Sequence, residues 1–305
     1  MCETTYHIPA LLPQTLECLD IKPDGTYIDA TFGGGGHSRA ILERLGENGR
    51  LLGFDQDMDA LANAPGDPRF TFVRSNFRFV ANFLRYYGIG QADGILADLG
   101  VSFHHFDDAA RGFSFREDAP LDMRMNQKAP ETAAELLRHL DEKDLLSLFR
   151  TYADLKNPGK VAKAIAAAKS GSGIQTTFQL ADTVRPALNA KAEKKEMAQV
   201  FQALRIAVNS EMEALTDLLT AAPKILKPGG RAVILTYHSV EDRIVKNFFR
   251  SGNAEGKIEK DFFGRVECDW KQITRSPITA DAAEIERNPR SRSAKLRCAE
   301  LMHNA

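Results

Sequence analysis

The sequence predicts an α/β fold in which a Rossmann-like, mostly parallel sheet is interrupted by an inserted all-helical domain. Over the first hundred residues, short apolar runs alternate with helical stretches, as in parallel sheets that carry helices on both faces. From about residue 113 to residue 210, strand candidates stop and alanine-rich helical stretches follow one another; a strand pattern then returns near residue 227. We therefore expect one domain from residues 1–112 and 211–305, and a helical domain from residues 113–210.

The first part of the chain contains four strand candidates, two of which lead into a predicted helix. The strands are expected at Tyr27–Ala30, Leu51–Phe54, Phe70–Val73 and Ile95–Ala97, and the helices at Arg39–Leu45 and Asp59–Ala64. In open parallel sheets, ligands bind beyond the carboxyl ends of the strands. The residues that follow these ends are therefore expected to face one site: Gly33–Gly36, Asp55, Asn76 and Asp98.

The middle and the end of the chain carry their own signals. Thr132-Ala-Ala-Glu135 has capping-box spacing before an apolar run, which indicates a helix start. Further helices are expected at Lys160–Lys169, Thr177–Leu188 and Glu196–Val208. A turn feeds a buried strand within Lys227–Tyr237, and weaker strand candidates at Ile258–Ile273 and Ser293–Ala299 are expected to form a closing antiparallel pair.

Composition places the chain among ordinary globular proteins. Of its 305 residues, 43% are hydrophobic and 27% charged. No apolar run approaches the roughly 20 residues needed to span a bilayer, and the first ten residues lack signal-peptide features, so we expect a cytoplasmic protein without a membrane partner. The four cysteines are far apart and form neither a disulfide framework nor a metal-binding pattern: Cys2, Cys18, Cys268 and Cys298. No metal is expected.

The glycine-rich loop Gly33–Gly36 is the clearest ligand-binding signal. Consecutive glycines allow positive φ and let the backbone approach a ligand closely, and a helix start offers unpaired N–H groups. The dinucleotide fingerprint G-x-G-x-x-G fits at Gly33 and Gly35, but Ser38 occupies its third glycine position. The loop therefore favours a nucleoside derivative other than NAD.

Three side chains near predicted strand ends are candidates for contacts with that ligand. Asp55 lies nineteen residues after Gly36, where nucleotide-binding folds place an acid that accepts hydrogen bonds from ribose hydroxyls; the alternative is a helix-capping carboxylate. Asp98 precedes a glycine-containing turn and would face the site, unless it only forms that turn. Phe77 has the position of an aromatic that packs on a purine, although a lone phenylalanine is more often a core residue.

Taken together, the motifs resemble those of the MraW family, the bacterial ribosomal RNA small-subunit methyltransferases H. The resemblance runs nearly end to end. The matching segments are residues 27–38, 53–57, 93–102, 111–115, 120–125, 201–206, 238–246 and 288–294.

The resemblance implies a class I S-adenosylmethionine-dependent methyltransferase with an inserted helical domain. It further implies N4-methylation of a decoding-centre cytidine in 16S ribosomal RNA, with the small-subunit RNA, assembled or nearly assembled, as partner. The implied cofactor contacts are Gly35, Gly36 and His37 at the methionine and ribose end, Asp55 at the ribose, Phe77 near the adenine and Asp98 at the reactive end.

The chain departs from the family pattern in two places. The family has Ser-Pro-Gln after the Asp-Leu-Gly-Val-Ser motif, whereas here Phe103-His-His105 follows and His105 stands at the cofactor-binding glutamine position. An imidazole cannot reproduce the paired hydrogen bonds of a carboxamide. Before Phe201, the family often has a His-Pro-Ala-x-Arg-Thr run, where this chain has residues 194–200 of different character.

The chemistry of N4 methylation makes Asp98 the candidate catalytic residue, as the acceptor of an N4 proton, with a nearby carbonyl as the alternative. The cytosine N4 lone pair is delocalised into the ring, so positioning of the reactants and an acceptor for an N4 proton both favour transfer. Methylation at C5 would need a cysteine nucleophile near the site, and no cysteine lies near an early strand end. The Asp-Pro-Pro-Tyr-type motif of DNA amino-methyltransferases is not matched by the segment that begins at Asp98.

Two segments near the end of the chain are candidates for substrate contacts. His238 and Asp242 would line the substrate side, unless His238 only caps or packs a helix. Lys224–Arg297 holds sixteen Lys or Arg against ten Asp or Glu, and its segment Arg287–Arg297 has five basic residues and no acid. Such a segment suits phosphate contacts, with a solvated face as the alternative.

Two other functions remain open at this point: a small-molecule methyltransferase on the same fold, and a non-catalytic RNA-binding assembly factor. The basic segment and the helical insert argue against the first. The intact Gly35, Gly36, Asp55 and Asp98 argue against the second.

Overall fold

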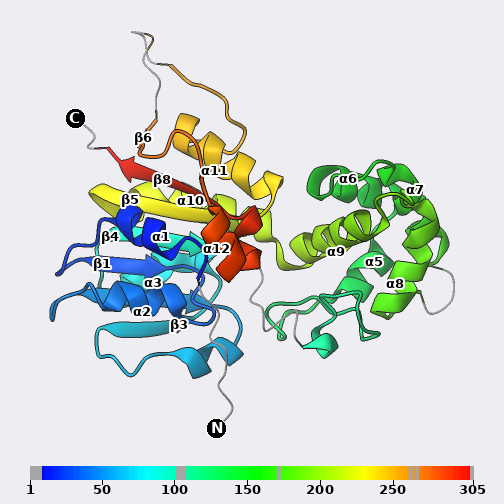
Figure 1. The fold of residues 1–305 in the computed structure, drawn as a ribbon, viewed down its shortest axis with the longest axis horizontal. Coiled ribbons are helices and arrows are strands. Elements are labelled where there is room, and N and C mark those ends of the chain that lie inside the picture. The colour runs from blue at the N-terminus through cyan, green and yellow to red at the C-terminus, as the bar shows by residue number, and fades with distance from the viewer. Residues whose placement is uncertain (1–8, 101–107, 170–172, 261–263, 265–267, 303–305) are drawn as a thin grey trace. The chain divides into compact units, whose positions relative to one another are not determined.

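A computed structural model describes residues 9–100, 108–169, 173–260, 264 and 268–302, which fold into two compact units (Figure 1). Unit 1 comprises residues 1–100 and 213–305, and unit 2 comprises residues 101–212. Unit 1 is a sheet with helices on both faces, and unit 2 is built from helices.

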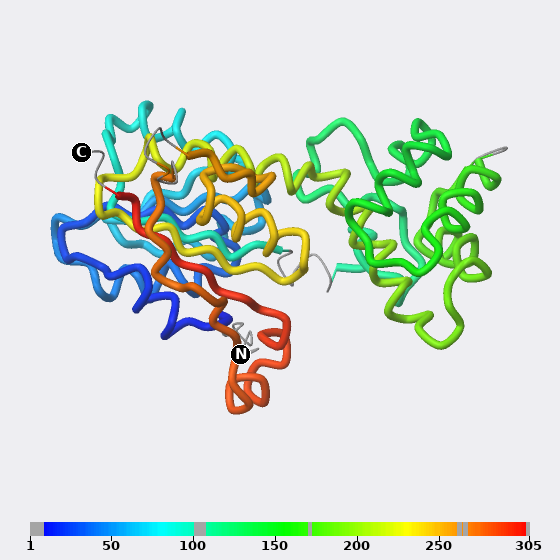
Figure 2. The backbone as a smooth tube through the Cα atoms, turned by 90° about the horizontal axis from the view of Figure 1, so that it is seen from above, coloured from blue at the N-terminus to red at the C-terminus, as the bar shows by residue number. Residues whose placement is uncertain are grey.

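The sheet of unit 1 has eight strands, of which seven follow the order β3-β2-β1-β4-β5-β8-β6, while β7 pairs with β8. Strands β1 to β5 are parallel, and β8 runs antiparallel between β5 and β6. Figure 2 shows β8 in red beside β5. The strands are β1 (Thr26–Asp29), β2 (Arg50–Asp55), β3 (Phe70–Arg74), β4 (Ala92–Asp98), β5 (Leu226–Thr236), β6 (Trp270–Gln272), β7 (Ile278–Thr279) and β8 (Lys295–Leu301). This mostly parallel α/β architecture confirms the predicted fold class.

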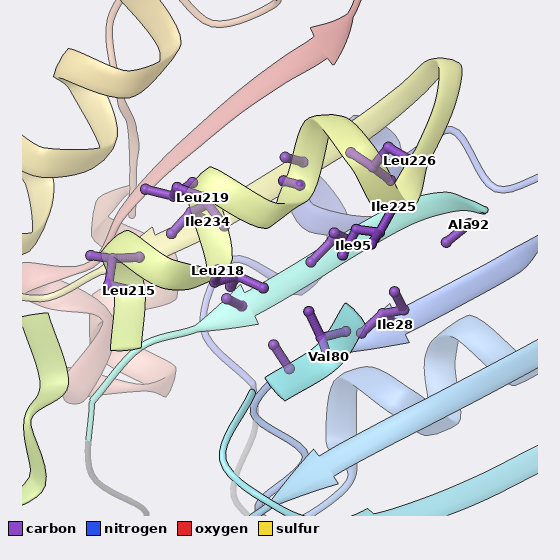
Figure 3. Packing of buried hydrophobic residues seen from close by; sticks show 14 of the residues in the cluster. Ile28, Val80, Ala92, Ile95, Leu215, Leu218, Leu219, Ile225, Leu226 and Ile234 are labelled. Atoms are coloured by element: carbon purple, nitrogen blue, oxygen red, sulfur yellow. The ribbon is translucent and has the colours of Figure 1, made fainter. Parts of the chain in front are cut away.

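The central strands are buried on both faces because neighbouring residues point into different cores. Ile28 and Ile95 belong to the core beneath α3 (Val80–Tyr86), α10 (Glu211–Ile225) and α11 (Ser239–Ser251). Figure 3 shows this core, with Leu215, Leu218 and Leu219 of α10 above the strands. Tyr27 and Leu96 face the opposite core, which α1 (Leu12–Leu19) and α2 (Gly36–Leu42) cover.

Short helical segments complete unit 1. They are the 3-10 helices η1 (Asp59–Asn63), η2 (Phe77–Phe79) and η5 (Pro289–Ser293), and the α-helix α12 (Ala282–Arg287).

Unit 2 has its own apolar core, contributed by each of its α-helices. At the start of α5, the Thr132 side chain accepts a hydrogen bond from the Glu135 N–H, and the Glu135 side chain accepts one from the Thr132 N–H. The predicted capping box is therefore present. Asp141 and Thr176 begin α6 and α8 in the same way. The elements are η3 (Ala109–Arg111), α5 (Ala133–His139), α6 (Glu142–Tyr152), α7 (Pro158–Ala167), α8 (Thr177–Val184), η4 (Arg185–Ala187) and α9 (Glu193–Asn209).

Several predicted elements differ from the observed ones. The helix expected at Asp59–Ala64 is the 3-10 segment η1, because five residues with only Ala60 buried offer no apolar face for an α-helix. The helix expected at Arg39–Leu45 starts three residues earlier, directly at Gly36. Among the described residues of the strand candidate Ile258–Ile273, the named strand is β6, and Ile258 is exposed.

Within the described ranges, no helix is both long enough and apolar enough to cross a membrane.

The packing of α10 on the sheet predicts a large loss of stability for Leu215→Ala. Leu215 is fully buried, and removing a buried leucine side chain costs about 2–5 kcal/mol in free energy of unfolding. Trp270, the single tryptophan, lies in the same core, so its fluorescence in a urea titration reports on unit 1. The control Leu61→Ala, at an exposed position, should change the free energy of unfolding by less than about 0.5 kcal/mol. A loss below about 1 kcal/mol for Leu215→Ala would contradict this packing.

Candidate functional site

The glycine loop follows β1 and turns sharply into α2. Gly35 has φ +71°, and a Cβ there would lie 2.8 Å from the Phe32 ring, so this position requires glycine. A Cβ on Gly34 would meet nothing within 4 Å. The loop is therefore packed against the protein at Gly35 and open at Gly34, which leaves backbone for a ligand to approach.

Asp55, at the end of β2, holds the loop in place. Its Oδ2 accepts a hydrogen bond from the Gly33 N–H at 2.8 Å, and its Oδ1 accepts one from the Asp57 N–H at 2.8 Å. An ionised carboxylate has about four acceptor positions. Asp55 thus lies at the strand end that was predicted to face the ligand, and it also fixes Gly33 through a hydrogen bond.

Arg39 and Asn63 fasten the loop from the other side. The Arg39 guanidinium donates to the carbonyl oxygens of Asn63 and Gly34, and the Asn63 amide donates to the Gly33 carbonyl at 3.1 Å. With the loop carbonyls engaged by η1 and α2, the loop conformation is fixed before any ligand binds, which lowers the entropic cost of binding.

Asp98 lies at the end of β4 and is held by three neighbouring groups. Its backbone N–H donates to Thr31 Oγ1 at 2.7 Å, and its Oδ1 accepts a hydrogen bond from the Tyr237 hydroxyl at 2.7 Å. His37 Nδ1 lies 3.6 Å from Oδ2. The side chain keeps 24% of its surface exposed, so it is reachable although its surroundings are largely dry.

Burial dominates the electrostatics of this cluster. It raises the pKa of Asp98 to about 7, with the Glu241 charge adding to the rise and the Tyr237 hydrogen bond opposing it. Burial also lowers the pKa of His37 and raises that of Tyr237 well above its ordinary value. His37 and Tyr237 are therefore neutral near pH 7, while Asp98 exchanges a proton in that range.

Asp29 and Ser38 anchor the start of α2. Asp29 is buried; its Oδ2 accepts from the Ser38 hydroxyl at 2.7 Å and its Oδ1 from the Thr31 N–H at 3.1 Å. Ser38, which takes the place of a third fingerprint glycine, thus binds the end of β1.

The structure places the remaining predicted residues as follows. A Cβ on Gly36 would lie 2.4 Å from the Pro9 ring, so the protein itself occupies the space beside Gly36. The His37 ring is buried, with Nε2 3.3 Å from the Ala10 carbonyl oxygen. Phe77 begins η2 and packs against a core cluster while staying partly exposed. His105 lies outside the described residues.

The two candidates after β5 have structural partners. His238 is the N-cap of α11: its ring accepts from the Glu241 N–H, and Glu241 Oε2 accepts from the His238 N–H at 3.3 Å. Asp242 forms ion pairs with Arg297 and Lys295. These contacts correspond to the capping alternative for His238 and leave the Asp242 carboxylate bound to β8.

Three site residues were missed by sequence reasoning: Thr31, Tyr237 and Glu241. Only Glu241 had a usable signal, because His238 and Glu241 have the capping-box spacing. Thr31 and Tyr237 reach Asp98 across 67 and 139 residues of sequence, a separation that no local pattern reveals.

In the described part of the chain, no group of three or more His, Cys, Asp or Glu side chains is arranged to hold a metal ion.

Comparison with known proteins gives this arrangement a family. The model of the MraW methylase family matches residues 4–302. The chain belongs to the MraW methylase family. Members of this family are methylases with a Rossmann-like sheet, and the methyl group comes from S-adenosyl-L-methionine. S-adenosyl-L-methionine is therefore the cofactor of this chain.

MraW-family relatives match over nearly the whole length. The chain is 58% identical over 298 residues to the ribosomal RNA small subunit methyltransferase H of Bacteroides thetaiotaomicron, covering 98% of both chains. It is 53% identical over 303 residues to the protein of that name from Porphyromonas gingivalis, covering 98% of this chain and 97% of the relative. An rRNA methylase structure from Streptococcus thermophilus aligns with a TM-score of 0.42 at 10% identity, over 95% of each chain.

The residues present fit the methylase cofactor. A Cβ at Gly34 would meet no atom within 4 Å, so the backbone there is open, and the Asp55 carboxylate lies beside the same loop, where it accepts from the Gly33 N–H. Asp98 places a second, partly exposed carboxyl at the same edge of the sheet.

The raised pKa of Asp98 predicts that Asp98→Asn stabilises the methylase at high pH. The unfolded chain releases the Asp98 proton near pH 3.8, but the folded protein keeps it until about pH 7; ionisation therefore favours unfolding as pH rises through that window. The difference in free energy of unfolding between Asp98→Asn and wild type should be near zero at pH 4. At pH 8 the variant should be more stable by about 2–4 kcal/mol.

Urea titrations at several pH values measure this difference. The control Asp24→Asn, at an exposed position, should change by less than about 0.5 kcal/mol over the same range. A difference for Asp98→Asn that stays flat with pH would show that Asp98 ionises normally.

Proposed function

We propose that this MraW methylase transfers the methyl group of S-adenosyl-L-methionine to N4 of a decoding-centre cytidine in 16S ribosomal RNA. The observation that carries the proposal is the Asp98 carboxyl, which is partly exposed beside the glycine loop and has a pKa of about 7. The family match and the name of the relatives support ribosomal RNA of the small subunit as substrate.

The reaction needs a group that takes a proton from N4. The cofactor supplies an electrophilic methyl carbon; the new bond joins that carbon to N4, the bond from carbon to sulfur breaks, and N4 loses one proton. Asp98 takes up this proton. Because its pKa lies near 7, a large fraction is ionised at neutral pH while the carboxylate stays a stronger base than an exposed aspartate.

The geometry of the loop supports the following cofactor contacts. Asp55 accepts hydrogen bonds from the ribose hydroxyls, and the open backbone at Gly34 receives the methionine and ribose end. Gly35, Gly36 and His37 shape that backbone: the first two are packed against Phe32 and Pro9, and the His37 ring lies beside Asp98, with Nδ1 3.6 Å from Oδ2. Phe77 borders the adenine. His105 completes the set as the replacement for the family glutamine.

The RNA is bound by the basic segment before β8. Arg287, Arg290 and Arg292 are exposed on α12 and η5, and the first residue of β8 pairs with Thr236 at the carboxyl end of β5. This segment therefore lies at the edge of the sheet that carries Asp98. Recognition of the assembled or nearly assembled small subunit is assigned to the helical segment 113–210, and the reaction to the cytoplasm.

Deletion of the gene tests the proposal as a whole. N4-methylated cytidine should disappear from the decoding-centre fragment of 16S ribosomal RNA, as measured by mass spectrometry, and return with the wild-type gene but not with Asp98→Asn. Purified protein should methylate small subunits from the deletion strain. Persistence of the modified cytidine after deletion would refute the proposal; methylation of small molecules alone, or RNA binding without cofactor binding, would favour the two alternative functions.

The role of Asp55 predicts weaker cofactor binding by Asp55→Asn. A hydrogen bond to a charged acceptor is worth about 1.5–3 kcal/mol, so the Kd for S-adenosyl-L-methionine in calorimetry should rise about 10- to 100-fold. The control Asp59→Asn, exposed at the start of η1, should keep the wild-type Kd. Equal affinities for Asp55→Asn and wild type would remove Asp55 from the cofactor site.

The basic segment predicts a change in the salt dependence of RNA binding. With Arg287 and Arg292 both replaced by glutamine, the logarithm of the RNA association constant should fall less steeply with the logarithm of the salt concentration, by about two units of slope. Cofactor affinity should stay unchanged. The matched control replaces two exposed lysines, Lys22 and Lys271, by glutamine. If both double variants change the slope equally, the segment has no special role in binding RNA.

A further inference from the structure

The residue after β5, Tyr237, and the first turn of α11, which carries Glu241, supply two ionisable side chains that act on Asp98. Tyr237 donates its hydroxyl hydrogen to Asp98 Oδ1 at 2.7 Å. Its ring passes beside Gly100, where an added Cβ would lie 3.5 Å from the ring. Tyr237 thus occupies one oxygen of the carboxyl and fixes the direction in which the other points.

The second oxygen of Asp98 is left for another proton. Within the described ranges, Oδ2 accepts no hydrogen bond, and the nearest ring nitrogen, His37 Nδ1, is 3.6 Å away. If His37 Nε2–H donates to the Ala10 carbonyl oxygen at 3.3 Å, then Nδ1 carries a lone pair and cannot donate to Oδ2.

Glu241 is a buried carboxylate whose charge the helix cap does not require. It is 1% exposed, and its Oε2 accepts from the backbone N–H groups of Tyr237 at 2.8 Å and His238 at 3.3 Å. A glutamine performs this capping role equally well, and burying a charge is costly. Glu241 Oε1 lies 2.9 Å from His238 Nε2, so Glu241 binds both the backbone and the histidine ring at the start of α11.

Tyr237 links Glu241 to Asp98, because its backbone N–H donates to Glu241 Oε2 and its hydroxyl donates to Asp98 Oδ1. Glu241 raises the pKa of Asp98 and the Tyr237 hydrogen bond lowers it. The other ionisable groups on the elements around Asp98 are His37 on α2, which burial keeps neutral, Asp29 at the end of β1, and His238 next to Glu241. Tyr237 and Glu241 thus act on Asp98 in opposite directions.

We propose that Tyr237 and Glu241 are positioning residues for methyl transfer: Tyr237 orients the Asp98 carboxyl so that Oδ2 receives the substrate proton, and the Glu241 carboxylate strengthens Asp98 as a proton acceptor. The inference rests on the proposed function for its catalytic meaning. Its physical content, the control of Asp98 by Tyr237 and Glu241, does not depend on the identity of the substrate.

The test measures the proton affinity of Asp98 directly in the full-length protein. Carboxyl carbons of aspartate are labelled with ¹³C, the Asp98 signal is assigned by its loss in D98N, and it is titrated by NMR in wild type, Y237F and E241Q. Y237F should raise the Asp98 midpoint by about one pH unit, because a hydrogen bond to the ionised form is lost. E241Q should lower it by about half to one pH unit, because a nearby like charge is removed.

The same shifts should appear in the pH profile of methyl transfer under single-turnover conditions. The acidic limb should move up in Y237F, with about tenfold slower transfer at pH 6, and down in E241Q. E241Q keeps the capping acceptors, so its Tm should stay near that of wild type, whereas E241A should lose the cap and have a lower Tm.

A matched control separates this effect from the general loss of a buried carboxylate. E196Q makes the same change at Glu196 of unit 2, a buried glutamate that accepts backbone hydrogen bonds from Lys156 and Asn189, and should leave the Asp98 midpoint unchanged. Shifts of the same sign in Y237F and E241Q, or no shift in either, would overturn the inference. If the wild type methylates no ribosomal RNA, the proposed function fails, and the NMR titration still decides the roles of Tyr237 and Glu241.

Discussion

The parallel pairing of β1 with β4 is the constraint on which the rest of the site depends. Parallel pairing brings the carboxyl ends of both strands to one edge of the sheet, and the Ala30 N–H continues the ladder to the Leu96 carbonyl oxygen. The Thr31 hydroxyl can therefore accept from the Asp98 backbone. Strands β2 and β5, aligned in the same direction, add Asp55 and Tyr237 to this edge. The chemistry is thus assembled by backbone hydrogen bonding, and the side chains only refine it.

The predictable part of the fold is the part with strong local signals. Strands β1, β2 and β4 are buried on both faces, so each appears in the sequence as a continuous apolar run. Glycines and capping residues likewise mark the starts of α2 and α5. Elements with a poor local pattern were either not predicted or predicted as the wrong type. Helix α1 was not predicted, and it begins after Leu11, whose φ of 52° follows no sequence signal. Segment η1 was predicted as an α-helix.

The same distinction applies to the site. The places of Asp55 and Asp98 at strand ends were predictable, because position along a strand is a local property. Their partners are not local: Gly33, Thr31 and Tyr237 contact these acids only after the sheet forms. Their environment, which moves the pKa of Asp98 to about 7, is likewise a product of tertiary packing. Sequence therefore indicates which groups are candidates, and packing determines what each of them can do.

The interruption of the sheet also has a consequence for synthesis on the ribosome. Strand β4 ends at Asp98 and its neighbour β5 begins at Leu226, while β8, which pairs with β5, begins at Lys295. At about 5–20 residues per second, roughly 6–26 s separate the emergence of the end of β4 from that of the start of β5. During this interval the edge of β4 that pairs with β5 has no partner. Unit 2, which is encoded between β4 and β5, can complete its own core in that time. The nascent chain thus carries a finished insert on an unfinished sheet.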